Sequence, residues 1–402
     1  MGLRSIREIY VIGHGPSSSH TMGPYFASQA IVNKYKDKGI KSIEVTLYGS
    51  LALTGRGHLT DKIVELALKD YTHQVLFDLK TKKKHPNTMV FKVVTQNKTY
   101  KETVVSIGGG SILTSDNKQD LIKSEIYPHQ YMDDIVNYCK KNKLSFYDYI
   151  KKYEDDSLEK YMKKVLKTMD EAVERGLLAE GYLPGELKVK RKAKKMYEAM
   201  EETDLGLNDV AMNVAIHSFA VAEENAAGGI IVTAPTCGSA GVIPGCVKYL
   251  RMKKVIDENI IKGLAVAALF GMVCKTNASV SGAEAGCQAE IGVACAMGAA
   301  MIAFAKDMGN RKAAEAAEIA LEHSLGLTCD PVKGYVQIPC IERCAMYALK
   351  AKNAVSLVKL IPYSSQVISF DDSVKTMYAT GKDLACGYRE TGEKGLGSLK
   401  KF

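Results

Sequence analysis

A run of hydroxyl side chains around one histidine stands close to the amino terminus, just before a segment of helical character. Its members are Ser17, Ser18, Ser19, His20 and Thr21. The first N–H groups of a helix lack partners within the helix and carry a partial positive charge, so hydroxyl groups beside them suit a carboxylate or a phosphate. His20 can act there as a general base or orient a ligand. The alternative is that one serine caps the helix and the other hydroxyls face solvent.

A second histidine lies in a glycine-rich segment. His58 follows Gly55-Arg56-Gly57 and precedes Asp61, a carboxylate that can orient its ring. The segment begins at the carboxyl end of an expected strand, where the sites of α/β proteins tend to open. His58 is therefore a second candidate base, and the alternative is a surface histidine near the start of a helix.

The chain has ten cysteines, and nine of them lie after residue 230. The amino terminus lacks the apolar core of a secretory signal, which favours metal binding or catalysis over disulfides. Cys287 lies among small residues, whereas Cys329 and Cys340 lie near prolines, on backbone that cannot be regular helix. Three thiolates at one point suit an iron–sulfur cluster. Their separations of 42 and 11 positions match no compact ferredoxin or zinc pattern, and buried free cysteine explains such spacing more often.

Three cysteines that hold four irons would leave one iron without a thiolate. That iron would be a Lewis acid with an exchangeable position. A Lewis acid makes a hydroxyl usable as a leaving group, which suits a lyase. Asn225 and Thr236 are neutral polar residues near glycines that could orient a substrate, although structural capping explains each of them about as well.

The first 150 residues are expected to mix helices and strands. Ser42–Tyr48 alternates apolar and polar residues, which predicts a strand. Met89–Thr95 and Thr99–Ile107 are predicted to pair as a hairpin. Pro24–Tyr35 and Asp61–Tyr71 have helical character.

Beyond about residue 150 the sequence predicts helices almost throughout. Ser157 is expected to cap a helix that begins at Leu158, and Gly176 is expected to end it. We therefore expect an α+β fold, with a small α/β domain over residues 1–152 and a large all-helical domain over residues 153–402.

The composition narrows the class of protein. A formal charge of +9 comes from 54 basic and 45 acidic residues, but no nucleic-acid-binding motif accompanies it, so nucleic acid is not an expected partner. The longest uncharged stretches, Ile291–Ala305 and Leu264–Cys274, are shorter than the roughly 20 residues of a membrane span. We expect a cytoplasmic protein that does not bind a membrane, and a homodimer is our expectation for its assembly.

Taken together, these segments resemble the iron–sulfur L-serine dehydratases, in the family's order and over nearly the whole chain. The matching segments are Gly15–Thr21 with Gly23-Pro24, Leu47–His58, Ser106–Gly110, Glu223–Gly229 with Thr233–Thr236, Asn277–Ala294, Leu325–Arg343 and Met377–Thr391.

The resemblance implies a [4Fe–4S] cluster with an open iron, held by Cys287, Cys329 and Cys340. It implies that L-serine binds at that iron and that the Ser17–Thr21 turn holds its carboxylate. A base, His20 or His58, would remove the Cα proton while the β-hydroxyl leaves as water. The resulting aminoacrylate would hydrolyse to pyruvate and ammonia, without pyridoxal phosphate.

Some positions depart from the family's pattern. Many members end in a cysteine that can reach the cluster, whereas this sequence ends Lys400-Lys401-Phe402. Cys344 and Cys237 stand where members often have asparagine, and extra thiols near a site can raise oxidation sensitivity or simply pack. The alternatives that stay open are a lyase acting on threonine or cysteine, a cluster-bearing sensor without turnover, and a zinc-binding structural protein.

Overall fold

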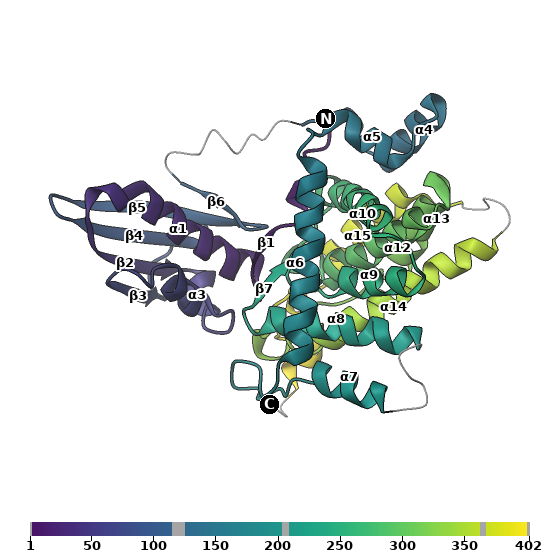
Figure 1. Cartoon of the computed structure of the whole chain (residues 1–402). Coiled ribbons are helices and arrows are strands. Elements are labelled where there is room, and N and C mark those ends of the chain that lie inside the picture. The colour runs from purple at the N-terminus through teal and green to yellow at the C-terminus, as the bar shows by residue number, and fades with distance from the viewer. Residues whose placement is uncertain (1, 115–124, 203–208, 362–366, 400–402) are drawn as a thin grey trace. The chain divides into compact units, whose positions relative to one another are not determined.

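The computed structural model describes residues 2–114, 125–202, 209–361 and 367–399, so the carboxy-terminal Lys400-Lys401-Phe402 lies outside the described residues. The chain forms two compact units, shown in Figure 1. The sheet unit comprises Gly13–Lys123 and Ala227–Ile230, and the helical unit comprises the remaining segments. The expected α+β class is confirmed. A division by compactness leaves the predicted boundary between residues 152 and 153 untested, and that boundary stays a prediction.

The sheet unit is built on five strands in the order β3-β2-β4-β5-β6, in which β3 runs parallel to β2 and the other neighbours are antiparallel. Its elements are α1 (Gly23–Tyr35), β2 (Ile40–Tyr48), α2 (Ser50–Leu53), α3 (Thr60–Ala67), β3 (His73–Asp78), β4 (Thr88–Thr95), β5 (Thr99–Gly108) and β6 (Ser111–Leu113). Two three-residue strands, β1 (Ile12–His14) and β7 (Ile230–Val232), pair separately and carry the chain between the units.

The core of the sheet unit lies between one face of the sheet and α1 (Figure 1). Ile43, Val45 and Leu47 of β2 are fully buried, as the alternation along this strand predicts. The predicted hairpin is confirmed, because β4 and β5 pair from Thr88 to Val94 across their short connection. The sheet thereby anchors the segments that precede α1 and follow β2, which carry the two candidate histidines.

The helical unit is centred on helix α12 (Val293–Ala305), whose residues are almost all buried. Its elements are α4 (Met132–Asn142), α5 (Phe146–Tyr153), α6 (Leu158–Leu178), α7 (Ala193–Glu201), α8 (Val210–Ala226), α9 (Val242–Met252), α10 (Asp257–Asn277), α11 (Gly282–Ala285), a π-helix (Gln288–Gly292), α12 (Val293–Ala305), α13 (Gly309–Glu322), α14 (Cys340–Leu360) and α15 (Phe370–Asp383). Helix α12 packs against α10, α13, α14 and α9. Its alanines and glycine let these neighbours approach closely, since small side chains shorten the distance between helix axes.

Two helices extend beyond the uncharged stretches seen in the sequence. Asp257–Asn277 and Gln288–Ala305 are long and apolar enough to cross a membrane by length and composition alone. The apolar windows of these helices are 78% and 89% buried inside the protein. The buried core helices of soluble proteins pass the same test, so this feature is weak evidence for a membrane span.

The structure of helix α6 differs in two details from the helix predicted between Leu158 and Gly176. Ser157 makes no capping bond to the helix, and its hydroxyl instead donates to the Asp155 carboxylate at 2.5 Å. Gly176 does not end the helix, which runs on to Leu178. The glycine has a packing reason: a Cβ at this position would lie 2.2 Å from the Ala220 carbonyl oxygen of α8.

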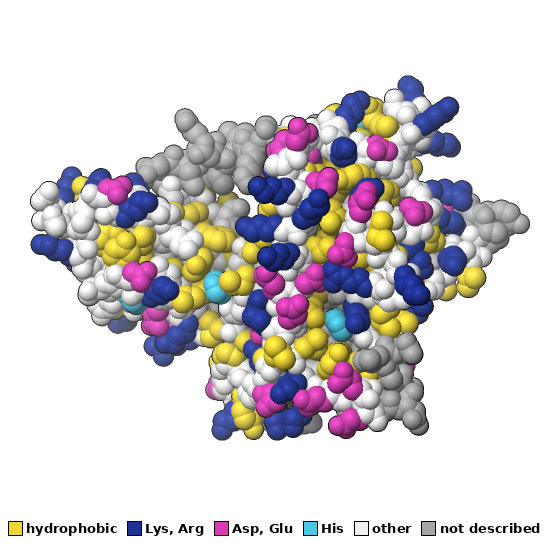
Figure 2. All heavy atoms as spheres, in the orientation of Figure 1, with side chains coloured by type: hydrophobic (Ala, Val, Ile, Leu, Met, Phe, Trp, Pro, Cys, Tyr) yellow, Lys and Arg dark blue, Asp and Glu magenta, His cyan; other side chains and the backbone are white. Residues whose placement is uncertain are grey.

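The exposed side of α6 carries charges of both signs, visible along this helix in Figure 2. Lys163 pairs with Glu159, and Lys167 pairs with Glu171, each at helical spacing. The opposite side, which includes Met162 and Val165, is buried. Helix α6 is therefore an amphipathic surface helix whose charges neutralise one another locally.

The first residues of the chain belong to the helical unit. Ile6, Ile9 and Tyr10 are completely buried. The Tyr10 hydroxyl donates to the carbonyl of Leu264 in α10 at 3.1 Å, and the Ile9 carbonyl accepts from the Thr233 hydroxyl at 2.8 Å. Residues 2–12 are thus part of the helical core, although the sheet unit follows them in sequence.

Replacement of Gly176 by alanine tests the close contact between α6 and α8. On an open helix surface, alanine would stabilise by up to about 1 kcal/mol. Here the new methyl group meets backbone, so we expect a net loss of about 1–3 kcal/mol. The thermal midpoint, followed by circular dichroism because the chain contains no tryptophan, measures the change. Glu174→Ala, on the exposed side of α6, is the control, and an equal or raised midpoint for Gly176→Ala would contradict the contact.

Candidate active site

The hydroxyl-rich turn of the sheet unit folds as a π-helix, Ser18–Met22, that continues directly into α1. The hydroxyl of Ser17 accepts from the His20 N–H at 3.2 Å, so Ser17 caps this helix. Thr21 is buried, and its hydroxyl donates to the His58 carbonyl at 2.8 Å. The Ser106 hydroxyl, from β5, donates to the Ser19 carbonyl at 2.7 Å. Ser17 and Thr21 thus fix the turn, as the capping alternative expects of one serine. The ligand-binding role of this run stays a prediction.

His20 and His58 come together inside this turn. Their ring centroids lie 4.7 Å apart. Both His20 nitrogens contact hydroxyls: Nδ1 lies 2.8 Å from Ser19 Oγ, and Nε2 lies 2.9 Å from Ser50 Oγ. His58 differs, because its Nδ1 lies 3.0 Å from the carbonyl oxygen of Thr54. A carbonyl can only accept, so Nδ1 of His58 carries the proton and its Nε2 presents a lone pair.

Both imidazoles are held in the neutral form. Burial, reinforced by the neighbouring His58, lowers the pKa of His20 to about 3. Burial also lowers the pKa of His58. A neutral imidazole with a free nitrogen can accept a proton, whereas an imidazolium cannot, so this environment suits a base.

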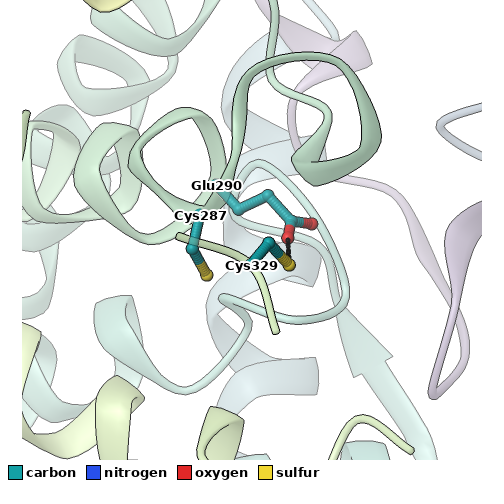
Figure 3. A group of neighbouring side chains, drawn as sticks. All are labelled: Cys287, Glu290 and Cys329. Carbon is teal, nitrogen blue, oxygen red and sulfur yellow. Dashed lines mark hydrogen bonds between the residues drawn. The ribbon is translucent and has the colours of Figure 1, made fainter. Parts of the chain in front are cut away.

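The helical unit gathers two of the predicted cysteines with one carboxylate. The donor atoms of Cys287, Glu290 and Cys329 all lie within 4.8 Å of one another (Figure 3). Cys287 follows Gly286, whose φ of 75° is in the left-handed region, and it directly precedes the π-helix that carries Glu290. Cys329 is fixed by its backbone N–H, which donates to the Tyr388 carbonyl at 2.8 Å. Two soft thiols and one carboxylate in one place are a donor set for a transition metal.

Arg343 is the cation next to this group. Its guanidinium hydrogen-bonds the Cys287 thiol and interacts with Cys340, which begins α14 one turn earlier. It also donates to the Thr328 carbonyl at 3.0 Å and lies 3.5 Å from the Asp330 carboxylate. Cys340 itself is partly exposed and lies outside the set of donors within 4.8 Å.

The ionisable groups of the set influence one another. The hydrogen bond from Cys329, together with Arg343, lowers the pKa of Cys287 and favours its thiolate. The same hydrogen bond and burial raise the pKa of Cys329. Burial and the negative charge at Cys287 raise the pKa of Glu290. A negative charge at Cys287 therefore opposes ionisation of its two neighbours.

The predicted polar residues of the helical unit differ in their surroundings. Asn225, in α8, is buried, and its Oδ1 has no hydrogen-bond partner within the described part of the chain. Thr236 lies 3.1 Å from the Ser239 hydroxyl and also hydrogen-bonds Glu290. Thr236 is thus linked to the cysteine group, and the Asn225 oxygen is available to a ligand or a water.

Each unit therefore brings together its own set of predicted site residues. The sheet unit gathers Ser17, Ser19, His20, Thr21 and His58, with Ser18 at the start of the same helix, and the helical unit gathers Cys287, Cys329 and Thr236. Sequence reasoning missed Glu290 and Arg343. Each stands three residues after a predicted cysteine, a spacing that places two side chains on one helical face.

A hollow elsewhere in the helical unit contains none of these residues. It has a volume of about 320 Å³ and is lined by side chains of α6, α8 and α9, among them His217 and Lys248. We identify the candidate site by the side chains that come together, such as Cys287, Glu290 and Cys329, and not by the volume of a hollow.

Comparison with known proteins matches the chain along most of its length. The family model described as "Serine dehydratase beta chain" matches residues 5–76, and that described as "Serine dehydratase alpha chain" matches residues 84–397. An L-serine dehydratase of Haemophilus influenzae is 36% identical over an alignment of 447 positions, which covers 98% of each chain. L-serine dehydratase 2 of Escherichia coli is 36% identical with the same coverage, and an L-serine dehydratase of Helicobacter pylori is 36% identical with 99% coverage of each chain.

The neutral state of His20 predicts a pH dependence of stability. The imidazole of His20 has a pKa near 6.5 in the unfolded chain. Between about pH 3 and 6.5 it therefore binds a proton in the unfolded chain and stays neutral in the folded protein. The free energy of unfolding therefore falls as the pH drops below 6.5 and is level above it, with a slope of up to about 1.4 kcal/mol per pH unit for one such group.

His20→Gln should flatten this slope, while glutamine keeps a donor and an acceptor for the two serines. Thermal midpoints between pH 5 and 7.5 measure it. His323→Gln, at the exposed end of α13, is the matched control. Parallel curves for the wild type and His20→Gln would show that His20 is not buried as a neutral ring.

Proposed function

The chain belongs to the serine dehydratase family, and we propose that it converts L-serine to pyruvate and ammonia with the help of an iron–sulfur cluster. The observation that carries this proposal is the convergence of Cys287, Cys329 and Glu290 in the helical unit, together with relatives named L-serine dehydratase that cover nearly the whole chain. The cluster that we propose is a [4Fe–4S] cluster with one iron lacking a protein thiolate.

The residues present fit such a group. Thiolates are the ligands of iron–sulfur clusters, and Arg343 favours the thiolate form of Cys287. We assign Cys287, Cys329 and Cys340 as the cluster ligands. When bound, the cluster supplies a Lewis acid that makes the β-hydroxyl of serine a better leaving group.

The protein's own groups would bind the substrate and move its protons. We assign Ser17, Ser18, Ser19 and Thr21 to the serine carboxylate, because the hydroxyls and first-turn N–H groups of this helix are donors. Asn225 and Thr236 are assigned to substrate orientation. The unpartnered Oδ1 of Asn225 supports its assignment, since it can accept a hydrogen bond from the substrate ammonium group.

His58 is the base that we favour. Its Nδ1–H is held by the Thr54 carbonyl, and this leaves Nε2 to accept the Cα proton. Both nitrogens of His20 already contact serine hydroxyls, so His20 is better suited to orient the turn and the neighbouring ring. After loss of water, the released aminoacrylate hydrolyses to pyruvate and ammonia.

An anaerobic assay of the reconstituted protein tests the function. We expect pyruvate from L-serine, about four irons with matching sulfide per chain, and less turnover of L-threonine or L-cysteine. Cys329→Ala should lose both cluster and activity, whereas Cys139→Ala, which removes a buried thiol of α4, should keep both. A full cluster without pyruvate from any of the three amino acids would point to a sensor, and zinc in place of iron would refute the cluster.

Replacement of His58 by alanine tests its role as the base. We expect a loss of kcat by a factor of about 10²–10⁴ with unchanged iron content, because a general base contributes about that much. His73→Ala is the matched control, since its Nδ1 contacts a backbone carbonyl in the same unit, that of Tyr71 at 2.8 Å. Normal turnover by His58→Ala would transfer the assignment to His20.

A further inference from the structure

Glu290 is the one oxygen donor in the cysteine group. Its Oε2 lies 3.8 Å from the sulfur of Cys329. Figure 3 shows the Glu290 carboxylate and the Cys329 side chain pointing toward each other. The sulfur of Cys287 lies near both of them. Glu290 reaches this point from the π-helix that begins directly after Cys287. The two residues are therefore fixed relative to one another by a single rigid turn.

Two glycines lie close to the Glu290 carboxylate. A Cβ on Gly282 would lie 2.5 Å from Oε2 and 3.0 Å from the sulfur of Cys329. On the other side, a Cβ on Gly238 would lie 3.6 Å from Oε1. Two glycine segments thus flank the carboxylate and the thiol closely, and Glu290 keeps a partly exposed surface between them.

No lysine or arginine forms an ion pair with Glu290 among the residues that the structure describes. The nearest cation, Arg343, is engaged by Cys287, the Thr328 carbonyl and Asp330. Thiolates and a carboxylate this close repel one another unless a cation lies among them. The geometry therefore places three donors that can become anionic around one space, with a single arginine beside them.

We propose that the carboxylate of Glu290 is an exchangeable oxygen ligand of the metal group, at the position that no thiolate occupies when substrate is absent. This inference rests on the proposed function and adds a residue that the cysteine pattern does not include. Hard oxygen donors are suitable ligands for an iron that lacks a thiolate. L-serine takes the position by ligand exchange, without any change of oxidation state.

Mössbauer spectra of the ⁵⁷Fe-reconstituted, anaerobic protein test the proposal. In substrate-free Glu290→Gln we expect the signal of about one quarter of the iron to change, since one iron of four loses its oxygen ligand. Saturating L-serine should make the spectra of variant and wild type coincide. We also expect a chelator to remove iron from the substrate-free variant about tenfold faster.

Glu284→Gln is the matched control, because it removes the same charge from an exposed residue of the adjacent α11. Its spectra and its rate of iron loss should equal those of the wild type. Glu290→Asp keeps a carboxylate, so it should restore part of the wild-type spectrum.

Identical substrate-free spectra for Glu290→Gln and the wild type, at equal iron and sulfide content, would overturn this inference and leave the proposed function intact. A wild-type protein without iron and sulfide would instead remove the cluster itself. If Glu290→Gln does not fold, Gly282→Ala replaces it, because its methyl group must displace the carboxylate. An unchanged substrate-free spectrum of that variant would equally overturn the inference.

Discussion

Electrostatic repulsion between closely placed acidic groups is the constraint around which the helical unit is organised. Cys287, Cys329 and Glu290 bring two sulfurs and a carboxylate within 4.8 Å of one another. Without a cation, such a group can ionise only in part, and the shifts of its pKa values in opposite directions express this. Arg343 compensates one negative charge. Ionisation of all three donors therefore requires a further positive charge, which a metal ion can supply; otherwise some donors keep their protons.

Rigid packing keeps these groups together against their repulsion. Gly286 turns the chain in the left-handed region just before Cys287, and the following π-helix runs straight into α12, whose residues are almost all buried. Cys340 and Arg343 lie in the first turn of α14, which packs against α12. Cys287, Glu290 and the neighbouring Arg343 are thus attached to one close-packed core, in which a shift of one residue would disturb several neighbours.

The sequence predicts the parts of this protein that depend on local pattern. The alternation in β2, the hairpin of β4 and β5 and the α+β class follow from residue periodicity. Gly176 shows the limit, because its role is a contact with Ala220, forty-four residues away (220 − 176), that no local pattern contains. Glu290 was missed for the same reason, because its partner Cys329 lies in a distant segment of the sequence. An acid beside a cysteine is unremarkable in sequence, and it gains meaning only when Cys329 is brought to it from another segment.

The burial of residues 2–12 in the helical unit makes the sheet unit an insertion within that unit and not a detachable leading domain. Truncation at the amino terminus would take Ile9 and Tyr10 away with the sheet and leave empty space beside α10. A helical unit made on its own would have to retain this segment, for example as an added peptide. The architecture thus favours excision over truncation for separating the two units, and it makes folding of the helical core depend on residues 2–12.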